Sequence, residues 1–291
     1  MGFISFIKST VCNTTIGSSV INWVRIRNLD EKYYDLFIRK KYRKDKLNPT
    51  EYMLQSLAFF ENNKDVIERN ISLLEDDLSK DVYKKAIKYR CSHDATDEPS
   101  YTKEKYFCDI LPLSEKEVFI DGGSFVGDTV RKFHKKTNGK YKKIVCFEPD
   151  TYNYKMLCKL KYNDVIKYNL GLWEYSTELN FFDNMSVGSK IVENGTKQDR
   201  LISIRVNSLD NIEECNDATI IKLDVEGSEQ KAIKGATKII KNNHPKLIIC
   251  LYHSNEDMLD IIPLVHALNP EYKLYVRSHS HQAAETVLYA I

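Results

Sequence analysis

The sequence predicts an α/β protein in which a doubly wound, mostly parallel seven-stranded sheet has an antiparallel last strand and follows an N-terminal helical region. Three observations support this prediction. From residue 117 onward, strand-like apolar runs alternate with helical stretches, as in a parallel sheet. The first run, 118–120, leads into a glycine-rich turn. The last two runs leave no room for a helix between them, so they are expected to form a hairpin that reverses the final strand.

The helical region is expected to occupy residues 1–112 and the main domain residues 113–291. A helix start is predicted at 48–51, where a proline stands near the first helical position. We expect this region to cap the main domain, where it serves substrate choice or the formation of a homo-oligomer. The expected apolar helix faces carry Leu54, Leu57, Ala58 and Phe60, then Ile67, Ile71 and Leu74, then Val82, Ala86 and Tyr89 in a helix that begins near Ser79.

The main domain can be assigned element by element from apolar runs and helical periodicity. The runs 178–182 and 201–206 are typical of two additional antiparallel strands. The strands expected in the sheet are 118–120, 143–147, 165–168, 218–223, 247–251, 273–276 and 286–289. The expected helices are 128–136, 151–161, one that passes through Ala232 and Ala236, and 256–268, which contains Pro263.

Composition excludes several classes of protein. The chain has 291 residues, 42% of them hydrophobic, which is enough for a sizeable core. Positive and negative charges are interspersed with a formal net charge of +2, so we expect no nucleic-acid partner. The basic cluster at 39–46 is interpreted as a solvated helix end.

The seven cysteines are scattered and form no C-x-x-C pair, which indicates a reducing compartment. Cys250 and His253 lack a second pair with ligand spacing, so no zinc or other resident metal is expected. No signal peptide is recognised, and no apolar run is long enough to cross a bilayer. We therefore expect a cytoplasmic protein with no stable membrane insertion.

The glycine-rich turn reads D-G-G-x-x-x-G from Asp121 to Gly127. Glycine permits positive φ and lets a ligand approach the backbone, and the N–H groups at the following helix start would point at that ligand. The spacing departs from the dinucleotide fingerprint G-x-G-x-x-G, which disfavours an NAD-dependent enzyme. It suits a cofactor that has a cationic amino-acid end and no pyrophosphate, such as S-adenosylmethionine. The alternative is a purely structural turn.

Acidic residues follow two further strands. Glu148 is placed to accept hydrogen bonds from both hydroxyls of a ribose, whereas Asp150 fits the capping of the next helix better. Asp224 and Glu226 follow the fourth strand, where they can orient a substrate hydroxyl, contact the amino group of a cofactor or hold a divalent cation. Only one of these two can be the cap of the following helix.

Three histidines are expected at the same sheet edge: His253 after the fifth strand, and His279 and His281 after the sixth. A histidine is the usual side chain for moving a proton near neutral pH. We favour His253 as the general base, with Asp224 and His281 as the alternatives.

These motifs, taken in order, resemble those of the FkbM family of S-adenosylmethionine-dependent methyltransferases over residues from about 105 to 291. The resemblance implies a class I methyltransferase sheet and O-methylation, often of sugars. It places Asp121, Gly123 and Gly127 at the methionine end, Glu148 at the ribose and Gly171 near the adenine. It is carried by residues 118–129, 147–150, 169–173, 222–229, 235–236 and 285–291.

The resulting hypothesis is an S-adenosylmethionine-dependent O-methyltransferase that acts on a small-molecule or glycan acceptor. Ser124-Phe125 stands where the family often has alanine or asparagine, which is a mild departure. The alternatives are a methyltransferase assisted by a divalent metal and a catalytically silent cofactor-binding module. The expected catalytic residues are His253, Asp224, Glu226 and His281, and the expected cofactor-binding residues are Asp121, Gly122, Gly123, Ser124, Gly127, Asp128, Glu148, Pro149, Gly171 and Asp224.

Overall fold

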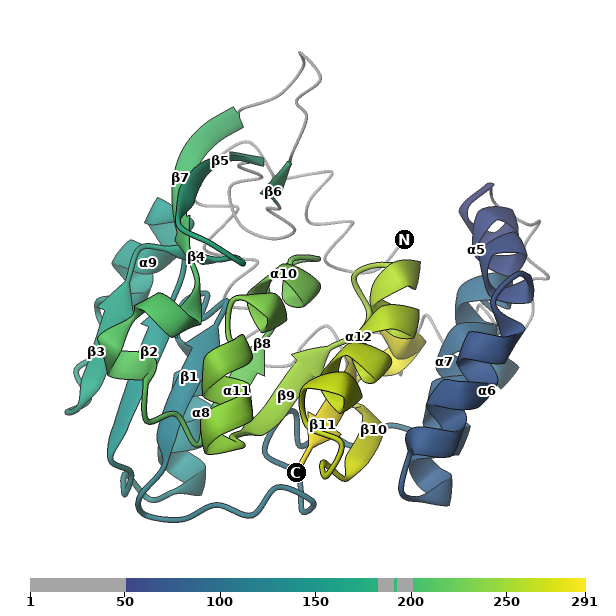
Figure 1. The fold of residues 1–291 in the computed structure, drawn as a ribbon, viewed down its shortest axis with the longest axis horizontal. Helices are drawn as coiled ribbons and strands as arrows, with labels where there is room; N and C mark the ends of the chain where they lie inside the picture. The colour runs from purple at the N-terminus through teal and green to yellow at the C-terminus, as the bar shows by residue number, and fades with distance from the viewer. Residues whose placement is uncertain (1–50, 183–190, 193–200) are drawn as a thin grey trace.

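The structure is a computed structural model that describes residues 51–182, 191–192 and 201–291. Part of the predicted helix start, at 48–50, and the basic cluster at 39–46 lie outside the described residues. The described elements form one main sheet with helices on both faces and a smaller sheet beside it (Figure 1).

The main sheet has seven strands in the order β10-β11-β9-β8-β1-β2-β3. All neighbours run parallel except β11, which is antiparallel to both β10 and β9. The doubly wound α/β class and the reversed last strand are therefore confirmed. The strands are β1 Val118–Gly122, β2 Lys143–Phe147, β3 Val165–Tyr168, β8 Ile220–Leu223, β9 Lys246–Cys250, β10 Leu274–Ser278 and β11 Thr286–Ala290.

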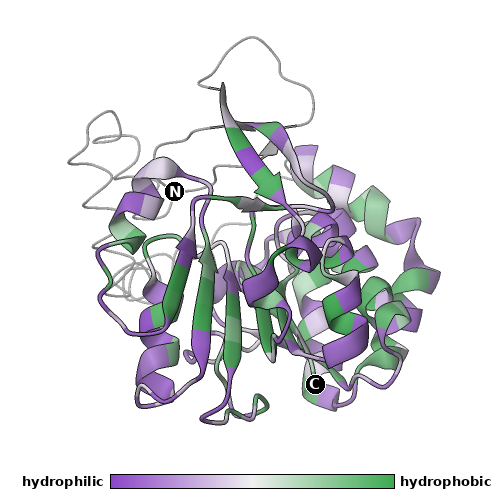
Figure 2. Ribbon diagram, turned by 60° about the vertical axis from the view of Figure 1, so that its left-hand side comes forward, coloured by the Kyte–Doolittle hydropathy of each residue, from purple (hydrophilic) through white to green (hydrophobic). Residues whose placement is uncertain are grey.

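Alternation along the buried strands sorts their side chains into two cores, one on each face of the sheet. On β1, Val118 and Ile120 belong to the larger core and Phe119 to the other. Hydrophobic residues run along these strands in Figure 2. The smaller core includes residues of α8 Asp128–Lys136 and α9 Thr151–Leu157, and the larger includes residues of α10 Glu229–Lys234, α11 Thr237–Asn243 and α12 Asn255–Leu268.

The N-terminal helices share the larger core. Val82, Tyr83 and Ala86 of the third helix are fully buried in it. In the first helix the predicted apolar face is confirmed only at Phe60 and is wrong at Leu54 and Leu57, which are 54% and 45% exposed. Ala58 is exposed as well, and the buried residues of this helix are Met53, Ser56 and Phe60. The helices are α5 Glu51–Glu61, α6 Lys64–Leu73 and α7 Asp77–Ser92.

The two additional antiparallel strands are confirmed as β5 Thr177–Phe182 and β7 Leu201–Asn207. They form a second sheet in the order β4-β7-β5-β6. The short strands β4 Gly171–Leu172 and β6 Ile191–Val192 were not predicted. Because β4 follows β3 almost directly, this sheet is tied to the carboxyl end of the main one.

Several predicted boundaries differ from the structure. The helix expected through Ala232 and Ala236 is divided into α10 and α11, and a Cβ on the intervening Gly235 would lie 2.0 Å from the carbonyl oxygen of Trp173. The helix expected to reach residue 161 ends at Leu157. Pro263 is accommodated inside α12. Short 3-10 turns occur at η2 Ala95–Asp97, η3 Leu209–Asn211, η4 Glu213–Cys215 and η5 His281–Ala283.

No helix in the described part of the chain combines the length and the apolar character needed to cross a membrane.

Candidate functional site

The glycine turn after β1 is held by the neighbouring strand. The carbonyl oxygen of Phe147 accepts the N–H groups of Gly123 at 3.0 Å and Ser124 at 2.9 Å. The Ser124 hydroxyl donates to the carbonyl oxygen of Asp121 at 2.7 Å and accepts from the Phe147 N–H at 3.2 Å. Ser124 therefore braces the turn. Gly127 is the N-cap of α8, with φ 80° and no capping side chain, and Asp128 opens the helix.

Gly123 has a positive φ of 73°, as the turn requires. The space beside it is filled by protein, because a Cβ there would lie 1.8 Å from the carbonyl oxygen of Asp224. The sequence-based expectation that this glycine keeps room for a cofactor therefore needs correction. Its lack of a side chain lets the turn after β1 approach the segment after β8. Gly122 is also crowded, because a Cβ added there would lie 2.8 Å from a methyl group of Leu172.

Lys222 joins these two segments, and it is a residue that the sequence-based site did not include. It lies opposite Asp121 in the register of β1 and β8 and is 1% exposed. Its Nζ lies 3.0 Å from Asp121 Oδ1 and donates to the carbonyl oxygens of Gly122 at 3.0 Å and Gly123 at 2.9 Å. Burial lowers the pKa of Lys222, but the carboxylates of Asp121 and Asp224 outweigh it and raise the pKa. A lysine inside an apolar strand was the signal for this role.

Glu148 lies beside the glycine turn and is 6% exposed. Its Oε2 accepts the Phe125 N–H at 2.7 Å, and its Oε1 accepts the Asp150 N–H at 2.9 Å. Burial raises the pKa of Glu148 to about 8. Asp150 accepts the Asn153 N–H at 2.7 Å as the N-cap of α9, the capping role that its position suggested.

The segment after β3 supports the Glu148 loop. The Asn169 side-chain amide donates to the carbonyl oxygens of Glu148 and Pro149, both at 2.9 Å. A Cβ on Gly171 would lie 3.7 Å from the Cβ of Pro149. The structure thus brings Glu148, Pro149 and Gly171 together beside the turn.

Asp224 follows β8 and is engaged on both carboxylate oxygens. Tyr106 donates its hydroxyl to Oδ2 at 2.7 Å and Tyr252 donates to Oδ1 at 2.8 Å. Lys105 Nζ is 3.9 Å from Oδ2 and forms a closer ion pair with Glu285. Burial raises the pKa of Asp224, but Lys105 and Lys222, with further contributions, outweigh burial and hold it well below its usual range. Asp224 is therefore a fixed anion.

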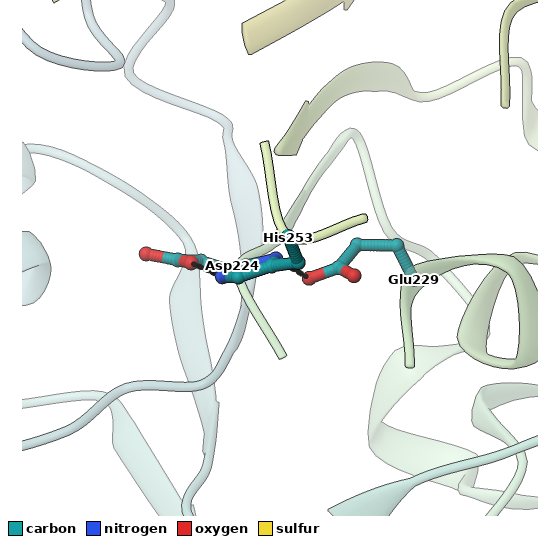
Figure 3. Close-up of side chains that lie close together, drawn as sticks. All are labelled: Asp224, Glu229 and His253. Carbon is teal, nitrogen blue, oxygen red and sulfur yellow. Dashed lines mark ion pairs between the residues drawn. The ribbon is translucent and has the colours of Figure 1, made fainter. Parts of the chain in front are cut away.

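His253 lies between two carboxylates (Figure 3). Its Nδ1 is 3.0 Å from Glu229 Oε1, and its Nε2 is 3.4 Å from Asp224 Oδ1 and 3.7 Å from Glu226 Oε2. Burial lowers the pKa of His253, but these carboxylates, Glu229 first, outweigh burial and raise the pKa to about 9. His253 is therefore mainly protonated at neutral pH.

Glu229 was quoted in the sequence motif but was not among the predicted site residues. It is fully buried and accepts the N–H groups of Val225 at 2.7 Å and Gly227 at 3.0 Å. These two bonds close the turn after Asp224, in which Glu226 has a positive φ of 55° and an exposed side chain. Glu229 therefore shapes the turn and fixes one face of the His253 ring.

The other two histidines have partners elsewhere. His281 Nδ1 is 3.0 Å from Glu98 Oε1, and its Nε2 is 2.8 Å from the Tyr101 hydroxyl. The Nε2 of His279 is 2.6 Å from the hydroxyl of Tyr289. Burial lowers the pKa of His279 to about 4. Both ring nitrogens of His281 are thus occupied by side chains outside the Asp224–His253 group.

Asp224, Glu229 and His253 each have a donor atom within 4.8 Å of the others, close enough for a metal ion to be considered. The two carboxylates, however, face opposite nitrogens of one imidazole ring (Figure 3). A histidine binds an ion through one nitrogen in the ring plane, so these three side chains, as placed, do not all converge on one ion position.

The carboxyl edge of this doubly wound sheet gathers the glycine turn, Glu148 and the Asp224–His253 pair, and this is the edge at which such sheets bind nucleotide-like ligands. The family model of the methyltransferase FkbM domain matches residues 121–273, which is more than half of the chain. The protein belongs to the FkbM methyltransferase family.

Solved structures support the fold. A methyltransferase FkbM from Methylobacillus flagellatus KT superposes with a TM-score of 0.68 at 22% identity, covering 83% of this chain and 62% of that one. A precorrin-6y C5,15-methyltransferase from Geobacter metallireducens GS-15 superposes only loosely, with a TM-score of 0.39 at 10% identity over 62% of this chain and 81% of that one. No curated protein sequence matches the chain.

Proposed function

We propose that the protein transfers a methyl group from S-adenosylmethionine to a hydroxyl group of a sugar or glycan precursor. The observation that carries the proposal is the joint placement of the glycine turn, Glu148 and the Asp224–His253–Glu229 group at one edge of the sheet. Membership of the FkbM methyltransferase family supports the reaction class.

The residues present fit S-adenosylmethionine. Glu148 is a buried carboxyl beside the turn, suited to the two ribose hydroxyls. The buried cation in this region, Lys222, is occupied by Asp121 and by turn carbonyls, so it does not offer a pyrophosphate partner. Asp224, Glu226, Glu229 and Glu285 provide four carboxylates against the cations of Lys105 and His253. An excess of negative charge favours a cationic sulfonium ligand.

When bound, S-adenosylmethionine supplies an activated methyl group, so the protein mainly contributes proximity and orientation. The one proton that must move belongs to the acceptor hydroxyl. Nε2 of His253 is the proposed acceptor of that proton, because Nδ1 lies closer to its carboxylate, at 3.0 Å from Glu229 Oε1, than Nε2 does, at 3.4 Å from Asp224 Oδ1. Asp224 is a poorer acceptor for this proton, since both its oxygens are hydrogen-bonded and its pKa is held low. Its proposed role is to orient the imidazole.

The proposal is tested by incubating the protein with methyl-labelled S-adenosylmethionine and a panel of nucleotide sugars, glycans and lipid-linked sugars. Mass spectrometry then identifies any acceptor that gains a methyl group. We expect a labelled O-methyl product with wild type and at least a roughly hundredfold slower reaction with His253→Ala. Label on nitrogen or carbon would contradict O-methylation, and no labelled product with any acceptor class would contradict the function.

A methyltransferase assisted by a divalent cation is the second candidate, because donor atoms of Asp224, Glu229 and His253 lie within 4.8 Å of one another. A chelator separates the two proposals. If His253 alone accepts the proton, the methylation rate stays unchanged after exhaustive treatment with the chelator. A rate that is lost and then restored by a divalent cation would favour the metal-assisted reaction.

A further inference from the structure

Buried polar groups of the N-terminal helices converge on the segment that carries His253. The loop after β9 contains Tyr252 and His253 and continues into α12, which begins at Asn255. From α7, Arg90 donates hydrogen bonds to the Tyr252 carbonyl oxygen and to Asn255 Oδ1, the latter at 3.1 Å. One guanidinium therefore holds the chain on both sides of His253.

Arg90 is only 8% exposed. Its third partner is the hydroxyl of Tyr52 on α5, at 3.1 Å, so its hydrogen-bond acceptors among the described residues are uncharged, and the carboxylate of Asp257 acts on it only through its field. A buried charge is costly unless it is well hydrogen-bonded. The planar fork of the guanidinium donates to acceptors on three different segments at once, which fixes where those segments lie.

Two further helix contacts act on the same segment. The Asn255 amide donates to the buried Ser56 hydroxyl of α5 at 3.0 Å. Tyr83 of α7 donates its hydroxyl to the carbonyl oxygen of Met258 at 2.8 Å, in the first turn of α12. The loop that presents His253 to Glu229 and Asp224 is thus also tied to α5 and α7.

We propose that Arg90 is a positioning residue for His253, through which the N-terminal helices set the geometry of the catalytic loop. The proposal rests on the proposed function only in assigning a reaction to His253. Removal of the guanidinium frees the loop, so the imidazole spends less time between its two carboxylates. The glycine turn and Glu148 lie after other strands, so cofactor binding is expected to be little affected.

The test compares Arg90→Met with Arg277→Met. Arg277 is a matched control because it is 7% exposed and also ties α7 to the sheet, through Asp76 at 2.6 Å and Ser79 at 2.8 Å. Hydrogen–deuterium exchange is measured by mass spectrometry on peptides that contain 252–255. The Arg90 variant is expected to exchange faster there, whereas the Arg277 variant keeps the wild-type rate in those peptides.

Turnover gives the second readout. A misplaced catalytic group costs rate more than binding, so Arg90→Met should lower kcat by roughly tenfold or more while KM for S-adenosylmethionine changes by less than about twofold. Arg90→Lys keeps the charge but not the fork, so it should restore little of kcat. Equal exchange and equal kcat in the Arg90 and Arg277 variants would overturn the proposal.

If Arg90→Met does not fold, Asn255→Ala replaces it, because that change removes one Arg90 acceptor and the Ser56 contact while leaving the guanidinium in place. Faster exchange at 252–255 is again expected, and an unchanged rate would contradict the proposal. The exchange measurement needs no acceptor. If the protein methylates no acceptor, the proposed function is refuted, and the exchange rates at 252–255 still decide whether Arg90 positions the loop.

Discussion

His253 is mainly protonated at neutral pH, because the carboxylates around it raise its pKa to about 9. Protonation opposes its proposed role as a general base. A general base must be unprotonated before it can accept a proton. Turnover is therefore expected to increase as pH rises through about 9. The bound sulfonium is a neighbouring positive charge, and it would move this rise toward lower pH.

Glu229→Gln tests this electrostatic account. Removing the largest source of negative charge lowers the pKa of His253, so the rising limb of kcat against pH should shift to lower pH. Glu226→Gln is the control, since Glu226 is more exposed and lies 3.7 Å from Nε2, and a smaller shift is expected. An identical pH profile for the wild type and both variants would show that His253 is not the group that titrates.

Glu148 supports a prediction about affinity for S-adenosylhomocysteine. Above about pH 8, where Glu148 is ionised, the affinity should fall in the order wild type, Glu148→Gln, Glu148→Ala, with the alanine loss at about 1.5–3 kcal/mol, the range for a hydrogen bond to a charged group. Because burial raises the pKa of Glu148 to about 8, ionisation above that pH should also strengthen wild-type binding. Calorimetry provides the measurement, with Asp150→Asn as a capping control that keeps wild-type affinity. Equal affinities of the wild type, Glu148→Gln and Glu148→Ala would show that Glu148 only stabilises the turn and does not bind the cofactor.

At the scale of the elements, the turn after β1 and the turn after β8 form one unit. Lys222 connects them by its ion pair and two carbonyl contacts, and Gly123 packs directly against the backbone of Asp224. The glycine turn and Asp224 are therefore expected to move together. A change in either turn should affect both cofactor binding and catalysis.

Gly123→Ala is predicted to lower stability more than Gly139→Ala. Both glycines have positive φ, at 73° and 74°, so both variants incur about 1–2 kcal/mol of backbone strain. Only at Gly123 does the new methyl group meet backbone, 1.8 Å from the Asp224 carbonyl oxygen, and overpacking adds about 1–3 kcal/mol. Urea unfolding of the two variants measures the difference. Equal losses would mean that the Asp224 carbonyl can move aside freely.

For the whole molecule, the N-terminal helices are part of the main core. Leu74 and Tyr83 are buried in the same apolar cluster as Ile249 and Met258 of the sheet and α12. A chain that begins at Leu113 would expose this surface to water. We predict that such a chain shows no cooperative thermal transition by circular dichroism. A cooperative transition near that of the full chain would instead establish residues 113–291 as an independent domain.

Sequence reasoning succeeded where the signal is local. Continuous apolar runs such as 143–147 predicted the buried strands, and the positions of Asp224 and His253 after two strands predicted that they would lie at the same sheet edge, where the structure brings them within 3.4 Å. It failed for α5, because Leu54 and Leu57 give that helix a second apolar face besides the one that includes Phe60.

The missed site residues depend on contacts distant in sequence. Tyr106 reaches Asp224, and Lys105 reaches Glu285, across long stretches of chain. Lys222 was visible as a lysine within an apolar strand, but its partners depend on the register between β1 and β8. Such pairings follow from the folded sheet and carry no periodic signal.

Calorimetric titration of the wild-type protein with S-adenosylhomocysteine measures whether this edge of the sheet binds the proposed cofactor. We expect saturable binding at one site per chain, with no heat of binding from NAD in a parallel titration. Absence of binding by S-adenosylhomocysteine, with or without binding of NAD, would mean that the glycine turn and Glu148 do not form a site for S-adenosylmethionine.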